Sequence, residues 1–249
     1  MPSGRTRSAE DDVRVLGLLP LVGHADSTAT VVTLFREAVN GLGADAGVFI
    51  SYLRDDATRN SLRSLWACDP DWAAEYANRG LFSHDPWLRY ATHESEPILA
   101  SAIKPVSVEE EAFLTTATSC GLASVLIAPA PSGVGTSRVG VLYLGSPNTQ
   151  HFENAADAKV LVLARALAME LHQWLQQNMR KELLFSSRIT DADLDLLRHE
   201  AAGHSSKVIA ATLNLEPTTI DCRFQRLNAK LEASDRRTAL RIAKLYGLV

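Results

Sequence analysis

The segment 189–249 constrains the fold more than any other part of the chain, because it holds start and stop signals of short helices in close succession. Thr190 precedes a turn with three aspartates, which is typical of a helix N-cap and its first turn. Gly203 can end that helix, and the serines two and three residues later can cap the next. Pro217 stands where the first turn of a further helix accepts proline. The segment is therefore predicted to be an all-α module of four short helices.

Helical periodicity orients the helix that follows Pro217. Its apolar residues recur every three or four positions and are predicted to face the core: Ile220, Phe224, Leu227 and Leu231. The opposite face carries small and amide-bearing side chains, which can approach DNA base edges: Thr218, Cys222, Gln225 and Ala229, flanked by Asp221 and Arg226. Two short helices joined by a tight turn, the second reaching the major groove, form a helix-turn-helix.

The charge distribution supports this interpretation. From Arg188 onward ten Lys and Arg face eight Asp and Glu, although the whole chain carries a net charge of −4. A basic module on an otherwise acidic chain suits contact with phosphate. A charge run alone is more often a solvated helix face, so it counts only together with the helical pattern.

The same segment resembles the DNA-binding domain of the LuxR/FixJ/NarL class of transcription regulators. The resemblance rests on Gly-x-Ser-x-Lys-x-Ile-Ala at 203–210, on Lys230-Leu231 and on the opening Ile189-Thr190. Together with the outward face of the helix after Pro217, it predicts DNA binding by one set of residues: Ser206, Lys207, Thr218, Thr219, Asp221, Cys222, Gln225 and Arg226.

Two positions depart from that class. Its members usually carry Lys or Arg at the place of Asp221 and often His at the place of Arg223. An aspartate cannot bind phosphate, but it can accept from cytosine N4, or pair with Arg223 or Gln225. The departure predicts either an altered target sequence or weaker binding.

The first three-quarters of the chain are predicted to be α+β. The expected strands are 48–53, 61–68, 122–128 and 139–144, and the expected helices are 31–39, 71–78, 86–92, 108–119 and 154–177. Strands close in sequence and joined by turns indicate an antiparallel sheet flanked by helices. The domains are then 1–177, a linker at 178–188, and the helical domain 189–249.

Several classes of protein are disfavoured. No apolar run reaches the roughly 18 residues of a membrane span, and the start lacks the apolar stretch of a secretory signal. Three scattered cysteines suggest neither disulfides nor a metal site and favour the reducing cytoplasm. The chain has no nucleophile elbow, no phosphate-binding loop and no metal-ligand spacing of histidines, so we expect neither an enzyme nor a cofactor.

Two sensor classes compete for the N-terminal domain. A phosphorylatable receiver needs a parallel βα repeat, which the predicted hairpins contradict. Trp72, Tyr76 and Asp85-Pro86 instead resemble the Trp-x-x-x-Tyr … Asp-Pro signature of the autoinducer-binding domain of LuxR-type quorum-sensing receptors. The resemblance implies an α/β/α sandwich that binds an N-acyl-homoserine lactone. Asp85 would accept from the ligand amide, Tyr76 would donate to its acyl carbonyl, and Trp72 would line the pocket.

The pocket signature is incomplete. Ala100 stands where the family has a Trp that grips the lactone carbonyl, Cys68 replaces a Tyr, and Val125 replaces a Gly. Trp87 is bulky where a smaller aliphatic is common. The candidate ligand residues are Trp72, Tyr76, Asp85, Trp87 and Ala100. Three outcomes stay open: altered affinity for a lactone, a different amphiphilic signal, or a pocket filled by side chains such as Trp87.

The sequence thus predicts a cytoplasmic, homodimeric transcription regulator whose partners are double-stranded DNA and a small-molecule signal, with no membrane partner. Its competitor is a ligand-independent antiactivator that forms heterodimers with a related regulator. Asp221 keeps that alternative open.

Overall fold

The computed structural model describes residues 7–54, 60–132, 138–155 and 157–249. They form two compact units, Met1–Trp174 and Leu175–Val249. None of the helices in the described part of the chain combines the length and the apolar character needed to cross a bilayer.

An antiparallel sheet of five strands, in the order β2-β1-β5-β4-β3, forms the middle of the first unit. Its strands are β1 (Ala46–Arg54), β2 (Asn60–Ala67), β3 (Ile98–Leu99), β4 (Ser124–Pro131) and β5 (Arg138–Ser146). The expected hairpins, β1 with β2 and β4 with β5, are both present. The predicted antiparallel α+β architecture is therefore confirmed.

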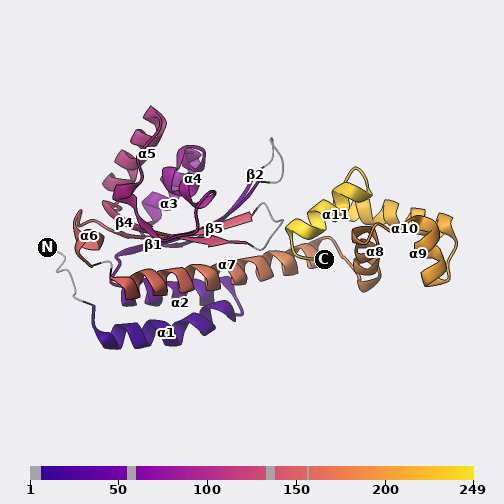
Figure 1. Ribbon diagram of the computed structural model, residues 1–249, viewed down its shortest axis with the longest axis horizontal. Coiled ribbons are helices and arrows are strands. Elements are labelled where there is room, and N and C mark those ends of the chain that lie inside the picture. The colour runs from indigo at the N-terminus through magenta and orange to yellow at the C-terminus, as the bar shows by residue number, and fades with distance from the viewer. Residues whose placement is uncertain (1–6, 55–59, 133–137, 156) are drawn as a thin grey trace. The chain divides into compact units, whose positions relative to one another are not determined.

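Helices cover both faces of this sheet (Figure 1). On one face lie α1 (Ala9–Gly23), α2 (Thr28–Gly41) and the first part of α7 (Ala158–Ser186), up to Trp174. On the other lie α3 (Pro70–Asn78), α4 (Pro86–Ala91) and α5 (Val108–Ser119). The shorter elements are η1 (Leu81–His84), η2 (Ala100–Ala102) and α6 (His151–Ala155).

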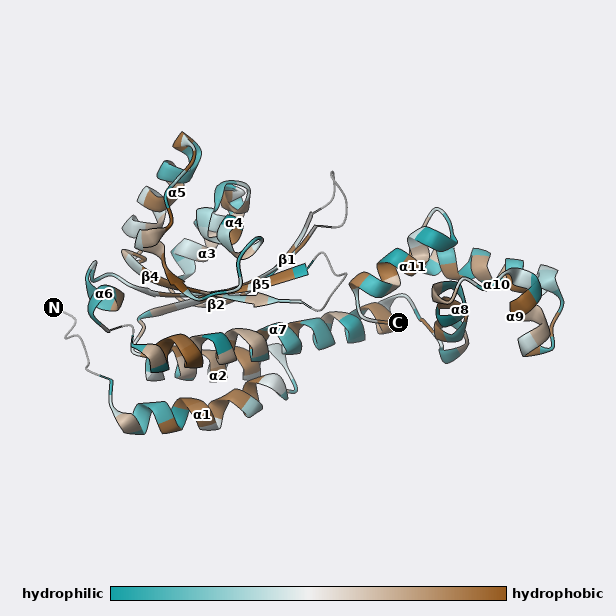
Figure 2. Cartoon of the chain, in the orientation of Figure 1, coloured by the Kyte–Doolittle hydropathy of each residue, from teal (hydrophilic) through white to brown (hydrophobic). Residues whose placement is uncertain are grey.

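The helix expected over 154–177 is two helices, α6 and the longer α7. The first half of α7 carries hydrophobic residues and the second half is largely hydrophilic (Figure 2). Buried side chains such as Leu167 and Leu171 hold the first half on the sheet. A Cβ at Gly140 of β5 would lie 2.5 Å from His172 Nδ1, so this glycine allows α7 to approach the sheet closely.

The second unit contains four helices after the end of α7: α8 (Asp191–Ala201), α9 (Ser206–Leu213), α10 (Pro217–Lys230) and α11 (Arg236–Leu245). Thr190 and Asp193 form a capping box that starts α8. Asn214, in the left-handed conformation, ends α9 and leaves a short turn before α10. Lys230 links α10 to α8 through a 2.6 Å ion pair with Asp193.

Candidate functional site

Asp85 is the N-cap of α4, and its carboxylate is almost completely buried, at 3% exposure. Oδ1 accepts hydrogen bonds from the backbone amides of Trp87, at 2.8 Å, and Leu88, at 3.0 Å. Oδ2 accepts from the hydroxyls of Tyr76, at 2.8 Å, and Tyr143, at 2.9 Å. Because a carboxylate offers about four acceptor positions, these donors satisfy it.

The burial of this group changes its acid–base behaviour. Burial raises the pKa of Asp85 to about 6, although the hydrogen bonds from Leu88, Tyr76, Tyr143 and Trp87 act in the opposite direction. Burial, and then the nearby Asp85 charge, hold the pKa values of Tyr76 and Tyr143 well above the ordinary tyrosine value. Both phenols are therefore donors at neutral pH.

Aromatic rings surround Asp85 and pack edge to face. Trp87 lies 5.0 Å from Phe113 and 5.1 Å from Tyr143, measured between ring centroids. Trp72 and Tyr76 are 5.6 Å apart, and each also contacts Phe113. Such contacts add stability beyond that of the buried area, so this cluster stabilises the core around Asp85.

The indole N–H groups of Trp72 and Trp87 are buried and have no hydrogen-bond partner among the described residues. An unpaired buried donor costs about 1–3 kcal/mol. Trp87 and Ala100 also line one cavity of about 590 Å³, whose apolar wall includes Leu114, Leu122 and Val125. One of the two unsatisfied donors, that of Trp87, therefore belongs to a residue that lines a cavity beside Ala100.

A second cavity, of about 520 Å³, reaches Asp85 and Leu88 from the side of Tyr52. Its rim carries the ion pair of Arg89 with Glu110, at 2.7 Å.

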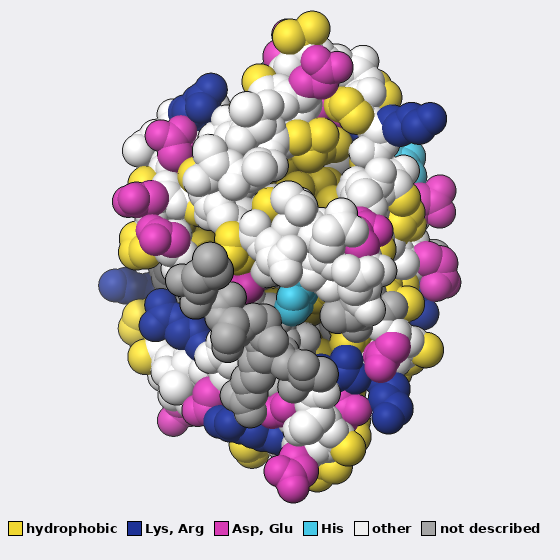
Figure 3. Space-filling model, turned by 90° about the vertical axis from the view of Figure 1, so that its left-hand side faces the viewer, with side chains coloured by type: hydrophobic (Ala, Val, Ile, Leu, Met, Phe, Trp, Pro, Cys, Tyr) yellow, Lys and Arg dark blue, Asp and Glu magenta, His cyan; other side chains and the backbone are white. Residues whose placement is uncertain are grey.

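Figure 3 shows one end of the first unit, where hydrophobic side chains lie in a hollow and acidic and basic groups are spread around it.

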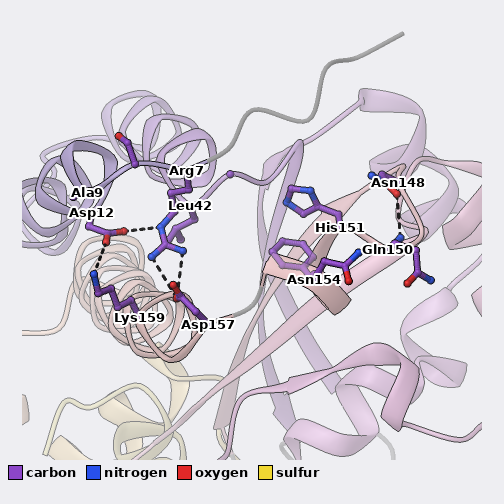
Figure 4. Close-up of a pocket in the computed structure, with 13 residues that line it drawn as sticks. Arg7, Ala9, Asp12, Leu42, Asn148, Gln150, His151, Asn154, Asp157 and Lys159 are labelled. Atoms are coloured by element: carbon purple, nitrogen blue, oxygen red, sulfur yellow. Dashed lines mark hydrogen bonds and ion pairs between the residues drawn. The ribbon is translucent and has the colours of Figure 1, made fainter.

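A third cavity, also of about 520 Å³, has a polar lining (Figure 4). Arg7 donates to Asp12 at 2.6 Å and pairs with Asp157 at 3.4 Å, and Lys159 lies 3.7 Å from Asp12. These charges neutralise one another, and the residues that line this cavity include none of the candidate ligand residues.

The structure brings the candidate ligand residues together. Trp72, Tyr76 and Trp87 belong to one buried cluster, and Ala100 packs against its edge. Sequence reasoning missed Tyr143, which the pairing of Val48 with Tyr143 between β1 and β5 brings over the cluster.

In the second unit, α10 has the two faces that its periodicity predicts. The inward residues are buried: Ile220, Phe224, Leu227 and Leu231. The outward residues are exposed: Thr218, Asp221, Cys222, Gln225, Arg226 and Ala229. Of the remaining candidates, Lys207 is exposed, whereas Ser206 and Thr219 are partly buried.

Asp221 has partners that the sequence analysis did not foresee. Ser206 Oγ donates to Asp221 Oδ1 at 2.7 Å, and Arg236 forms an ion pair with the same oxygen. These hydrogen bonds hold the pKa of Asp221 below its usual value. Of the two alternatives for Asp221, pairing within α10 with Arg223 or Gln225 is wrong, because the partners come from α9 and α11.

Residues 27–175 match the model of the autoinducer binding domain. The chain belongs to this family. All five candidate ligand residues lie inside the matched range, and the helices α8 to α11 lie outside it. The expected resemblance to LuxR-type regulators is confirmed at this level.

Solved structures of other proteins share the fold of this chain. Escherichia coli SdiA is 15% identical, with a TM-score of 0.72 over 95% of this chain and 98% of that one. SdiA in complex with octanoyl-rac-glycerol is 14% identical, with a TM-score of 0.69 over 98% of each chain.

A third structure covers less of the chain. The N-acylhomoserine lactone-dependent LuxR family transcription factor CepR2 of Burkholderia cenocepacia is 16% identical, with a TM-score of 0.54 over 66% of this chain and 96% of its own. A comparison with curated proteins finds no match.

Proposed function

We propose that this chain is a transcription regulator that binds double-stranded DNA in response to a small amphiphilic signal, acting as a homodimer in the cytoplasm. Residues 1–177 would bind the signal, 178–188 would connect the domains, and 189–249 would bind DNA. The observation that carries the proposal is the buried carboxylate of Asp85, held by two phenols, within an autoinducer-binding domain.

The contacts of Asp85 favour a particular chemistry of signal. Both acceptor positions of Oδ2 are taken by Tyr76 and Tyr143, so an entering amide or hydroxyl must replace one phenol there. The released phenol can then donate to a ligand carbonyl. The cavity beside Ala100 combines an apolar wall with polar residues such as Lys104, Ser124 and Glu153, which suits an amphiphile with an acyl chain and a polar head. An acylated glycerol and an acyl-homoserine lactone both meet these requirements. The acylated glycerol has no lactone carbonyl, so it has less need of a hydrogen-bond donor at the position of Ala100.

The DNA-binding part of the proposal rests on α9 and α10. They are joined by a short turn, as in a helix-turn-helix, and Gln225 lies on the exposed face of the second helix. A glutamine at such a place can pair bidentately with adenine. Lys207 and Arg226, both exposed, are suited to phosphate.

One observation favours the second candidate, a ligand-independent antiactivator that forms heterodimers. Trp87 packs against Phe113 and Tyr143, so its ring fills space above Asp85. The indole thus occupies space that a ligand would otherwise use, and Asp221 neutralises Arg236 of α11, which reduces the positive charge beside the outward face of α10.

A thermal-shift experiment separates these two functions. The purified chain would be heated with acyl-homoserine lactones of several chain lengths and, separately, with monoacylglycerols. A ligand at about 100 times its Kd should stabilise the fold by roughly 2.7 kcal/mol. Tyr76→Phe, which removes one phenol from Asp85, is the matched variant and should weaken the shift. An unchanged Tm with both panels would favour the antiactivator, and an electrophoretic mobility shift with promoter DNA tests the binding of DNA directly.

A further inference from the structure

Three helices of the second unit bring polar side chains to a single carboxylate oxygen. Ser206 is the first residue of α9 and Arg236 the first of α11, while Asp221 lies on α10. Ser206 Oγ lies 2.7 Å from Asp221 Oδ1, and Arg236 Nη1 donates to Ser206 Oγ at 2.8 Å. Arg236 Nη2 contacts the same Asp221 oxygen. A hydroxyl and a guanidinium thus converge on one anion.

The two donors are fixed by the fold, whereas the anion lies on the solvent side. The guanidinium carbon of Arg236 lies 4.0 Å from the ring centroid of the buried Phe224, which holds it by a cation–π contact. The Arg236 side chain is 27% exposed, compared with 55% for Asp221. Loss of the carboxylate would therefore leave the donors in place and open them to solvent.

This pair of donors suits a phosphate oxygen. The planar guanidinium matches carboxylate and phosphate equally well, and serine hydroxyls are common contacts of DNA phosphates. Lys207, exposed beside Ser206, adds positive charge at the same end of α9. The position of Asp221 is therefore one that a backbone phosphate of a duplex can take.

We propose that Ser206 and Arg236 form a phosphate-binding site on the DNA-binding unit, and that the Asp221 carboxylate occupies this site in place of phosphate. The inference rests on the proposed binding of DNA. It makes Asp221 an autoinhibitory group: the chain binds duplex DNA with one phosphate contact fewer than its fold provides.

Salt-dependent binding to a non-specific duplex tests the inference. Freeing one cation should make the slope of log K against log salt steeper by about 0.9 and raise affinity about threefold or more at low salt. Full-length Asp221→Ala should show both changes. Arg236→Ala alone should weaken binding, because it leaves the Asp221 carboxylate unpaired. Arg236→Ala combined with Asp221→Ala should show no gain in slope over the native chain. In Asp221→Asn the slope and the affinity should change in the same direction. Because this variant keeps an acceptor for both donors, it serves as a check if the alanine variant misfolds.

Asp195→Ala is the matched control, because Asp195 also belongs to an exposed ion pair of this unit, with Arg198. An equal gain in that variant would show a general effect of charge and would overturn the inference. An unchanged slope in both Asp221 variants would overturn it as well.

A second readout does not depend on DNA. Inorganic phosphate, compared with sodium chloride at equal ionic strength, should raise the Tm of Asp221→Ala but not that of the native chain or of the double variant. Failure of the native chain to bind any duplex at low salt would contradict the proposed function, whereas the phosphate result would still decide whether the site exists. A Tm of Asp221→Ala that is insensitive to phosphate would overturn the inference.

Discussion

The phenol of Tyr143 donates a 2.9 Å hydrogen bond to Asp85 across 58 residues of sequence. Tyr143 lies in β5 and Asp85 caps α4, so the bond ties the sheet to the helical layer above it. It also places a second donor on the oxygen that Tyr76 contacts.

Tyr143→Phe should lower the free energy of unfolding by about 1–3 kcal/mol, because it removes a donor from a buried charged acceptor without removing the ring. Chemical denaturation at neutral pH measures the loss. Tyr90→Phe is the control, since the Tyr90 hydroxyl contacts the carbonyl of Glu96 at the surface. A loss of equal size in both variants would contradict the role given to Tyr143.

Asp85 should make the fold less stable as the pH rises. Its pKa is about 6 in the folded chain and 3.8 in an ordinary aspartate, so the folded chain binds this proton more tightly. The resulting stabilisation, about 3 kcal/mol, is complete below pH 4 and lost as the pH rises through 6. Asp85→Asn removes this dependence, and denaturation at a series of pH values would reveal it as the difference between the two profiles. Parallel profiles would argue against a raised pKa.

His172 should have the opposite effect over almost the same pH range. Burial, and to a lesser degree the charge of Arg138, lower its pKa from 6.5 to about 4. The stability that it contributes, about 3 kcal/mol, is present above pH 6.5 and lost as the pH falls through 4. We therefore expect a nearly flat native profile from pH 4 to 6.5, a rising one for Asp85→Asn and a falling one for His172→Gln. A native profile as steep as that of either variant would show that the two effects do not oppose each other.

Ala100→Trp should increase the affinity for acyl-homoserine lactones. The cavity of about 590 Å³ beside Ala100 has room for an indole, which would supply an N–H donor for a lactone carbonyl. Ligand-induced shifts in Tm would be compared among the native chain, Ala100→Trp and Ala100→Phe, which adds bulk without a donor. Equal shifts for the Trp and Phe variants would mean that filling the cavity, and not the donor, controls binding.

Gln225→Ala should change which DNA sequence is preferred. Loss of a bidentate base contact costs about 1–3 kcal/mol at the base concerned, whereas Lys207→Ala or Arg226→Ala should weaken binding to all sequences alike. Competition between a selected site and random duplex DNA measures both effects. Equal losses of Gln225→Ala on the two DNAs would remove Gln225 from base recognition.

Local signals were enough to predict most secondary structure. The helix expected over 108–119 is Val108–Ser119, because Ser107 caps it and the turn at Gly121 follows it. The two faces of α10 follow from its period alone. Helix α1 was not predicted, although Ser8 and Asp11 form a capping box at its start.

Contacts between distant segments could not be derived in this way. In the sequence, Tyr143 cannot be distinguished from other strand residues. Only the pairing of β5 with β1 brings it to Asp85. Arg236 meets Asp221 because α11 packs against α10, and no spacing within α10 reveals such a partner. The residue types at the candidate sites were therefore readable from the sequence, and their partners were not.

The aromatic cluster around Asp85 has an optical consequence. The chain has four tryptophans, Trp66, Trp72, Trp87 and Trp174, and all precede residue 175. Intrinsic indole fluorescence therefore follows the unfolding of the first unit alone, with Trp72 and Trp87 reporting from its buried interior. Circular dichroism of the helices follows both units. A difference between the two melting curves would measure how far the units lose their structure independently, with no added label.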